Sequence, residues 1–177
     1  SKYTTSSPYS ASKAAADEII MAFYKTYKFP IIITRCSNNY GPYQFPEKLI
    51  PLMIVNSIQE KDMPVYGKGN QIRDWIYVED HVDAICEILK SGKIGEIYNI
   101  GQTEEISIKD LAQLVIDTTN SNSEVKFKSH KDVFGDKFED PTRRTPNIDK
   151  IIKATGIKPS YDIKTMIKEI VEFKRQD

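Results

Sequence analysis

Pro30-Ile31-Ile32-Ile33-Thr34-Arg35-Cys36 is the stretch of sequence that decides the fold. Because its β-branched residues form an almost continuous apolar run between loops, it predicts a strand buried on both faces, as in parallel sheets. Residues 8–27, just before it, carry small and apolar residues at helical spacing, with Ser7 suited to cap the helix and Pro8 to its first position. A helix followed by a buried strand is half of a parallel α/β unit, so we predict an α/β fold.

The alternation of helix and strand continues along the rest of the chain. The patterns predict helices at about 46–61, 79–90, 108–119, 148–154 and 163–175, and strands at about 64–66, 72–78, 96–100 and 125–128. Between the first strand and the next helix, residues 37–43 are rich in asparagine, glycine and proline, which predicts a loop.

Composition excludes several classes of function. Lys plus Arg number 25 and Asp plus Glu also number 25, so no overall positive field would attract nucleic acid or an anionic membrane. The longest near-apolar stretch, residues 49–55, is far shorter than the about 20 residues that a membrane span needs. Cys36 and Cys86 lie in unrelated contexts and no signal-peptide pattern is present, so we expect a reducing, cytoplasmic location. His81 and His130 are too isolated to predict a metal site.

The first motif with chemical meaning is Tyr9-x-x-x-Lys13. Its spacing places both side chains on one helix face, one turn apart. A cation beside a phenol favours the phenolate, which can then exchange a proton with a substrate hydroxyl. Tyrosine–lysine pairs also occur as ordinary decoration of helix surfaces, so the spacing alone leaves both interpretations open.

The surrounding sequence adds a family resemblance. The segment SSPYSASKAAAD at residues 6–17 resembles the active-site helix of extended short-chain dehydrogenases/reductases, specifically the NAD-dependent nucleotide-sugar dehydratases and epimerases. The segments CSNNYGPYQFPEKLIP at 36–51 and YGKGNQIRDWIYVEDH at 66–81 follow in the same order as in that family and look most like dTDP-glucose 4,6-dehydratases. The resemblance implies an enzyme that uses NAD and a nucleotide-diphosphate sugar, and that acts as a homo-oligomer.

The resemblance also implies roles for individual residues. Tyr9 would be the base that acts on the sugar C4 hydroxyl, while Lys13 would bind the nicotinamide ribose, so that both also contact the cofactor. Asn39 would bind the cofactor as well, and Asn38 the substrate. The alternative for both asparagines is that they satisfy backbone groups in a tight loop.

Further positions match the family's substrate site. The resemblance assigns substrate contacts to Lys48, Leu49, Pro64, Val65, Tyr66, Arg73, Arg143 and Arg144. Guanidinium groups bind phosphate oxygens bidentately, so Arg73 with one of the two adjacent arginines would form a pyrophosphate clamp. The alternatives are a solvated Lys48, a core Leu49, a plain edge strand at 64–66 and surface arginines. Asp74, Trp75, Asp80 and Asn99 lie in the matching motifs too, and we assign them to architecture.

Two departures from the family limit the predicted activity. The sequence has no Gly-x-x-Gly-x-x-Gly loop after a strand, and no Thr-Asp-Glu stretch before the tyrosine helix. We therefore expect a carboxy-terminal part that is inactive by itself, completed by an upstream segment or a complementary chain; a non-catalytic binding module and an interaction subunit are the alternatives. The segment DPTRRTPNIDK at 140–150 is more similar to epimerases and UDP-glucuronate decarboxylases, so the choice between dehydration, epimerisation and decarboxylation stays open.

The expected architecture is the carboxy-terminal part of a Rossmann-type parallel sheet with a smaller α/β substrate-binding lobe. The Rossmann-type part would comprise residues 1–38 and about 75–101, and the lobe would comprise about 39–74 and 102–177.

Overall fold

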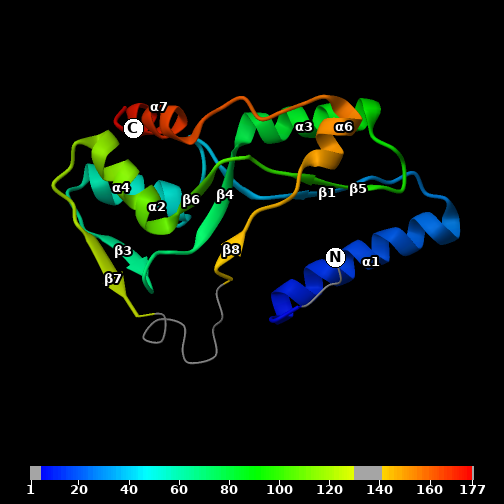
Figure 1. Ribbon diagram of the computed structural model, residues 1–177, viewed down its shortest axis with the longest axis horizontal. Coiled ribbons are helices and arrows are strands. Elements are labelled where there is room, and N and C mark those ends of the chain that lie inside the picture. Colours follow the sequence, from blue (N-terminus) through cyan, green and yellow to red (C-terminus); the bar gives the residue numbers. More distant parts are fainter. Residues whose placement is uncertain (1–4, 130–140, 177) are drawn as a thin grey trace.

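The computed structural model describes residues 5–129 and 141–176 of the chain, so the polar amino-terminal stretch at 1–4 and His130 lie outside the described residues. The helices are α1 (Pro8–Tyr27), α2 (Leu49–Ile58), α3 (Val78–Ser91), α4 (Ile108–Thr119), α6 (Asp149–Thr155) and α7 (Ile163–Lys174). The strands are β1 (Ile33–Cys36), β2 (Asn38–Tyr40), β3 (Met63–Tyr66), β4 (Ile72–Tyr77), β5 (Ile97–Ile100), β6 (Glu105–Ser107), β7 (Val125–Lys128) and β8 (Arg143–Arg144). Figure 1 shows how they are arranged.

The strands form mostly parallel pairs. β1 pairs with β5, β2 with β4 and β3 with β7, all in parallel, while β4 also pairs with β8 in parallel and with β6 antiparallel. The chain leaves the β1–β5 pair and enters the β2–β4 pair across Ser37, whose N–H donates to the carbonyl of Ile100 at 2.9 Å. The predicted α/β class with parallel strands is confirmed.

The start of α1 follows directly from its sequence. Ser7 accepts a hydrogen bond from the Ser10 N–H at 3.1 Å, and the Ser10 hydroxyl in turn accepts one from the Ser7 N–H at 3.0 Å. This reciprocal capping box, with Pro8 after it, satisfies donors that the first helical turn leaves open. The predicted cap and helix bounds are confirmed.

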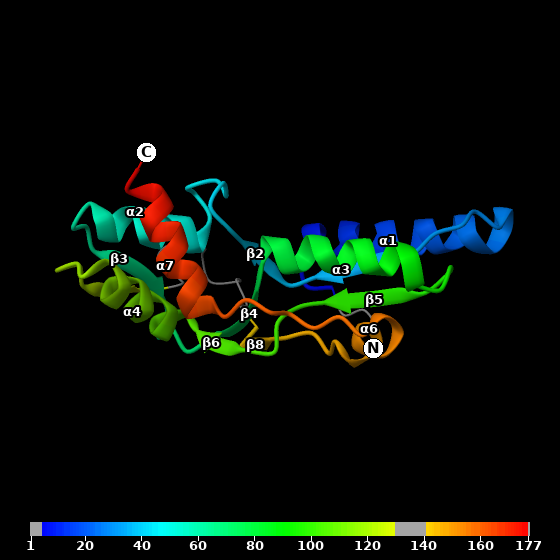
Figure 2. The same cartoon turned by 90° about the horizontal axis from the view of Figure 1, so that it is seen from above.

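The body of α1 makes few contacts with the rest of the molecule. None of its residues is buried, although Ile19 and Phe23 are large and apolar. Arg35 of β1 donates to Asp17 at 2.7 Å, and Tyr24 lies against the turn at Gly95, where a Cβ would fall 2.4 Å from the ring. Figures 1 and 2 show α1 running alongside β1, with its amino-terminal end directed toward β4 and β8.

Two hydrophobic cores lie on the two sides of β4. The larger core packs α2, α4 and α7 with β3, and includes the fully buried Ile54, Leu111 and Ile167. The smaller core packs α3 and α6 against β5, and includes Ile88 and Ile100. Trp75 and Tyr77 of β4 belong to the larger core whereas Ile76 belongs to the smaller one, so alternate residues of β4 serve different cores.

Asp80 ties the carboxy-terminal segment to α3. Its carboxylate accepts hydrogen bonds from the N–H and hydroxyl of Ser160 and from the N–H of Tyr161, at 2.9–3.1 Å. Because the side chain is buried, these donors replace the water that the charge loses.

The structure differs from the sequence-based predictions at three strands and at the ends of several helices. Residues 38–40 form β2 rather than a loop, because their backbone pairs with β4 and outweighs the turn preference of asparagine. β6 and β8 were not predicted, because they are only three and two residues long and exist through pairing with β4. α2 begins at Leu49 rather than at about 46, since Lys48 is still extended.

Truncating a core side chain tests this packing. Leu111→Ala should lower the free energy of unfolding by about 2–5 kcal/mol, because Leu111 is fully buried where α4 meets the larger core. Leu89→Ala is the matched control, since Leu89 is 75% exposed on α3, and should change it by less than about 0.5 kcal/mol. Urea unfolding followed by circular dichroism measures both. Equal losses in the two variants would contradict the assigned core.

Candidate functional site

The tyrosine–lysine pair lies on the first two turns of α1. Tyr9 is 73% exposed and Lys13 is also exposed, and the helix between them is regular, so the two side chains project from the same face. The Tyr9 carbonyl accepts a hydrogen bond from the Ser12 hydroxyl at 2.8 Å. The helix that the spacing requires is therefore present.

The two asparagines lie on β2 beside β4. Asn38 donates from Nδ2 to the carbonyl of Asp74 at 3.1 Å, and Asn39 donates from Nδ2 to the carbonyl of Ser37 at 3.3 Å. Both amide NH₂ groups thus satisfy backbone groups, as the alternative interpretation expected, although in a strand rather than a loop. The Asn39 Oδ1 atom is buried and accepts no hydrogen bond within the described residues. The Asn39 side chain therefore keeps one hydrogen-bond acceptor that no described residue uses.

The register of β8 on β4 separates the two adjacent arginines. Arg144 pairs with Arg73, and Arg143 pairs with Ile72. Because register partners in neighbouring strands point to the same face of a sheet, Arg73 and Arg144 share a face and Arg143 points to the other. Arg73 is buried and donates from Nη1 to the carbonyls of Ile72 and Pro141, both at 2.8 Å, whereas Arg144 is exposed.

Arg143 binds a carboxylate of the chain itself. Its Nε donates to Glu105 Oε2 at 3.0 Å and its Nη2 donates to the other oxygen, which makes a bidentate pair. These hydrogen bonds hold the pKa of the Glu105 carboxyl below its ordinary value. Sequence reasoning missed Glu105, since no local pattern shows that β6 and β8 both flank β4.

The remaining predicted substrate residues lie at the edge of the larger core. Lys48 precedes α2, is exposed, and places Nζ 3.7 Å from Glu47 Oε1. Leu49 packs against the larger core. On β3, Val65 is fully buried, so it can offer a ligand only its backbone, while Pro64 and Tyr66 are half-buried.

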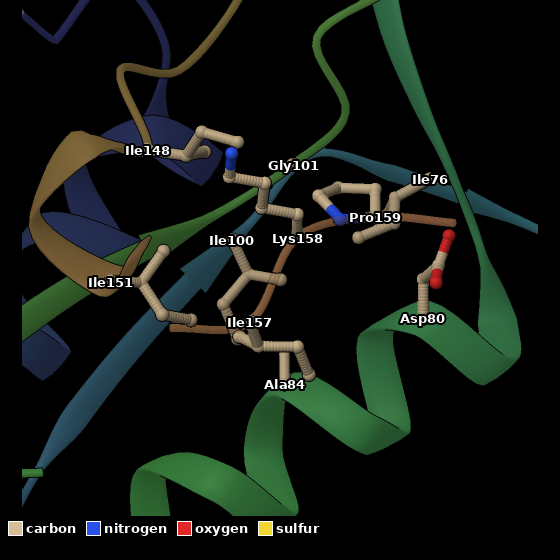
Figure 3. A pocket seen from close by; sticks show the side chains of 10 residues that line it. All are labelled: Ile76, Asp80, Ala84, Ile100, Gly101, Ile148, Ile151, Ile157, Lys158 and Pro159. Carbon is tan, nitrogen blue, oxygen red and sulfur yellow. The ribbon is translucent and has the colours of Figure 1, made fainter. Parts of the chain in front are cut away.

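A small hollow lies elsewhere, between α3, α6 and the segment at 157–159 (Figure 3). It is lined by Ile76, Asp80, Ala84, Ile100, Gly101, Ile148, Ile151, Ile157, Lys158 and Pro159. The lining is mostly apolar, and the carboxylate of Asp80 is engaged by Ser160 and Tyr161. None of the predicted site residues lines this hollow; they lie on α1, β2, the start of α2, β3, β4 and β8.

Two kinds of site are absent from the part of the chain that the structure describes. Within residues 5–129 and 141–176, no three His, Cys, Asp or Glu side chains gather closely enough to hold a metal ion. In the same part of the chain, no helix combines the length and apolar character that crossing a membrane requires.

Comparison with known proteins identifies the family. The family model of GDP-mannose 4,6 dehydratase matches residues 1–170. The chain belongs to this family. The resemblance inferred from the three sequence segments is thereby confirmed.

Members and structural neighbours of the GDP-mannose 4,6 dehydratase family cover almost the whole chain. The dTDP-glucose 4,6-dehydratase 1 of Escherichia coli strain K12 is 43% identical over 173 residues, which are 97% of this chain and 48% of that protein. The crystal structure of dTDP-glucose 4,6-dehydratase from Bacillus anthracis in complex with NAD has a TM-score of 0.90 and 38% identity, over 99% of this chain and 54% of that one. The Streptomyces venezuelae dTDP-glucose 4,6-dehydratase DesIV, with NAD and TYD bound, has a TM-score of 0.90 and 34% identity, over 100% of this chain and 53% of that one. The chain spans about half the length of the curated relatives it matches.

The pairing of Arg143 can be tested without any ligand. Arg143→Gln should raise the pKa of Glu105 toward its ordinary value, since the hydrogen bonds that stabilise its carboxylate are lost. Arg144→Gln is the control and should leave that pKa unchanged, because Arg144 points to the other face of β4. Carbon-detected NMR titration of the Glu105 carboxyl measures both. A pKa that responds to Arg144 instead would contradict the register of β8.

Proposed function

We propose that this chain carries the tyrosine–lysine pair and the nucleotide-sugar surface of an NAD-dependent nucleotide-sugar dehydratase of the dTDP-glucose 4,6-dehydratase type. One observation carries the proposal: Tyr9 and Lys13 project together from α1, within a sequence that is 43% identical to a dTDP-glucose 4,6-dehydratase. The similarity extends over 97% of the chain, which includes β2, β4 and β8 as well as α1.

The proposed substrate is a nucleotide-diphosphate sugar. Arg73 and Arg144 are the pyrophosphate clamp, because they share a face of the β4–β8 pair, and Arg143 is not part of it, because it is paired with Glu105. Asn38 contacts the phosphate-sugar region. The nucleotide base lies against β3, where Pro64, the Val65 backbone and Tyr66 receive it, and Lys48 and Leu49 contribute from the start of α2.

Part of an NAD site is available in the residues of this chain. Lys13 offers an exposed ammonium that can donate to ribose hydroxyls, and Asn39 lies half-buried on β2. The ammonium of Lys13 fits the nicotinamide ribose half of the dinucleotide. The pyrophosphate half needs backbone N–H groups of a glycine-rich turn, and this sequence contains no such motif.

The proposed chemistry begins at the C4 hydroxyl of the sugar. Tyr9 accepts the proton of that hydroxyl as C4 is oxidised, and Lys13 stabilises the phenolate that performs this step. When bound, NAD would supply the hydride-transfer chemistry at C4. The ketone acidifies the neighbouring C–H bond, which permits elimination of water, but the carboxylates that the family uses for elimination belong to a Thr-Asp-Glu stretch absent from this sequence.

We further propose that activity requires a second segment, in the same polypeptide or in a complementary chain, and that the 177 residues alone are inactive. Three observations support this. The chain spans about half of its relatives' length, β1 pairs with β5 alone among the described strands, and α1 buries none of its residues. Val82 and Leu89 on α3 are also exposed. A segment that adds a strand beside β1 would complete the Rossmann-type part, proposed as residues 1–38 and about 75–101, with the remainder as the sugar-nucleotide lobe.

A second candidate activity is nucleotide-sugar epimerisation or the decarboxylation of a UDP-glucuronate-like substrate. The segment at 140–150, which contains both arginines of β8, favours it by its resemblance to those enzymes. All three reactions use the same oxidation at the sugar, so Tyr9 and Lys13 keep their roles. A homo-oligomeric state and a cytoplasmic location remain predictions, the latter from the two free cysteines.

The pyrophosphate clamp predicts a preference between nucleotides. The chain should bind dTDP at least about tenfold more tightly than dTMP, because hydrogen bonds to charged phosphate oxygens contribute about 1.5–3 kcal/mol each. Arg144→Ala should abolish most of this ratio, while Arg143→Ala should preserve it, since Arg143 is engaged by Glu105. Calorimetry gives the affinities. Equal affinity of the wild-type chain for the two nucleotides would refute the clamp.

The role of Tyr9 can be tested in a chimera that joins this chain to the amino-terminal half of the Escherichia coli K12 relative. Tyr9→Phe should lower turnover of dTDP-glucose at least about 100-fold while dTDP affinity stays the same, because only the proton-transfer hydroxyl is lost. Tyr27→Phe, on the same helix and similarly exposed, is the control and should retain full turnover. Near-normal single-turnover reduction of NAD by Tyr9→Phe would show that the pair is structural.

A further inference from the structure

Asp74 is a carboxyl group with no access to solvent, next to Arg73 on β4. It lies on β4, is 0% exposed, and accepts a hydrogen bond at Oδ2 from the N–H of Gln102 at 2.9 Å. Its Oδ1 and the Ser37 hydroxyl are both buried, and neither makes a hydrogen bond of good geometry. The hydroxyl nevertheless lies near enough to stabilise the carboxylate. A buried carboxyl in this setting is costly and calls for a physical reason.

The partners of Asp74 come from the carboxyl ends of two parallel strands. Ser37 directly follows β1, and Gln102 is the second residue after β5. The backbone carbonyl of Asp74 also accepts the amide of Asn38, the first residue of β2, at 3.1 Å. One residue of β4 therefore contacts the end of β1, the end of β5 and the start of β2, where the chain passes from one sheet to the other.

Gly101 makes this approach possible. A Cβ at that position would lie 2.5 Å from Asp74 Oδ2 and 2.4 Å from Pro146 Cγ, both far inside contact distance. Only glycine lets the turn after β5 bring the Gln102 N–H onto the carboxylate. The contact between Asp74 and the turn after β5 therefore requires glycine at position 101.

Stability alone is a poor explanation for such a group. Burial raises the pKa of Asp74, which means that the charged form is disfavoured, and the carboxylate of Glu105 across the β4–β6 pair raises it further. The Ser37 hydroxyl and the Gln102 N–H offset only part of this cost. An apolar residue of similar size would avoid the desolvation penalty, so the carboxyl is better explained by geometry that it imposes.

We propose that Asp74 is a positioning residue of the nucleotide-sugar site, which holds Asn38 and Asn39 of β2 in place beside the strand that carries Arg73. This rests on the proposed function, because it assumes that those three residues bind ligand. Asp74 itself touches no ligand, since it has no exposed surface. Its side chain acts through Ser37, the residue before β2, whose hydroxyl stabilises the carboxylate, and through the Gln102 N–H.

Amide hydrogen exchange of the ligand-free chain tests the positioning directly. Asp74→Ala should accelerate exchange at residues 37–40 and 102–103 at least about tenfold, with α4 unchanged. Asp74→Asn should stay near wild type, because its amide oxygen can accept from Gln102 and no charge has to be buried. Asp80→Asn, another buried carboxyl, should accelerate exchange at 160–161 instead. Unchanged exchange at 37–40 in Asp74→Ala, or equal acceleration in α4, would overturn the proposal.

A second variant, Gly101→Ala, tests the same contact in case Asp74→Ala fails to fold. Gly101→Ala disturbs the same contact from the other side, so it should accelerate exchange over the same two segments. Combined with Asp74→Ala it should add less than it does alone, since the clash with Asp74 Oδ2 is then absent and only that with Pro146 remains. Fully additive effects of the two variants would count against the contact as the cause.

Affinity for dTDP gives the functional measurement. Asp74→Ala should bind dTDP at least about tenfold more weakly than wild type, Asp74→Asn within about threefold of it, and Asp80→Asn equally well. If wild type and Asp74→Ala bind dTDP equally, the positioning role is wrong while the proposed function stands. If wild type binds no dTDP, the proposed function fails, and with it the ligand-binding part of the role, while hydrogen exchange decides whether Asp74 holds β2 in place.

Discussion

The structure depends on the pairing of β4 with three other strands. β2 and β8 run parallel to it and β6 antiparallel, so its six residues supply hydrogen bonds to segments that are far apart in the sequence. Because neighbouring residues of β4 point to opposite faces, the same strand contributes Trp75 to one core and Ile76 to the other. A change in its register would move every one of these side chains to the wrong face.

The helices around β4 are buried to different extents. The larger core is closed by three helices, and α3 and α6 cover one side of the smaller core. α1, by contrast, meets the rest of the molecule through the Asp17–Arg35 ion pair and the contact of Tyr24 with the turn at Gly95. Since helices of proteins draw most of their stability from burying one face, the proposed second segment would stabilise the helix that carries Tyr9 as well as supply its chemistry.

The chain has a formal net charge of zero, but the arginines of β4 and β8 differ in their charged neighbours. Glu105 neutralises Arg143 on one face of the β4–β8 pair, and Arg73 and Arg144 lie together on the other face. The register of β8 therefore gives Arg143 a carboxylate partner within the chain and places Arg144 on the face of Arg73.

The sequence by itself determined the α/β alternation, the capped helix at 8–27, the Tyr9–Lys13 spacing and the family, because each rests on contacts between near neighbours or on contiguous motifs. Only the tertiary structure decided which arginine accompanies Arg73, that β2 is a strand, and that Asp74 meets Gln102. These depend on cross-strand register between segments about 28 to 71 residues apart, which no local propensity specifies. Local patterns report on one helix face or one strand face, whereas the site is assembled where several strands end together.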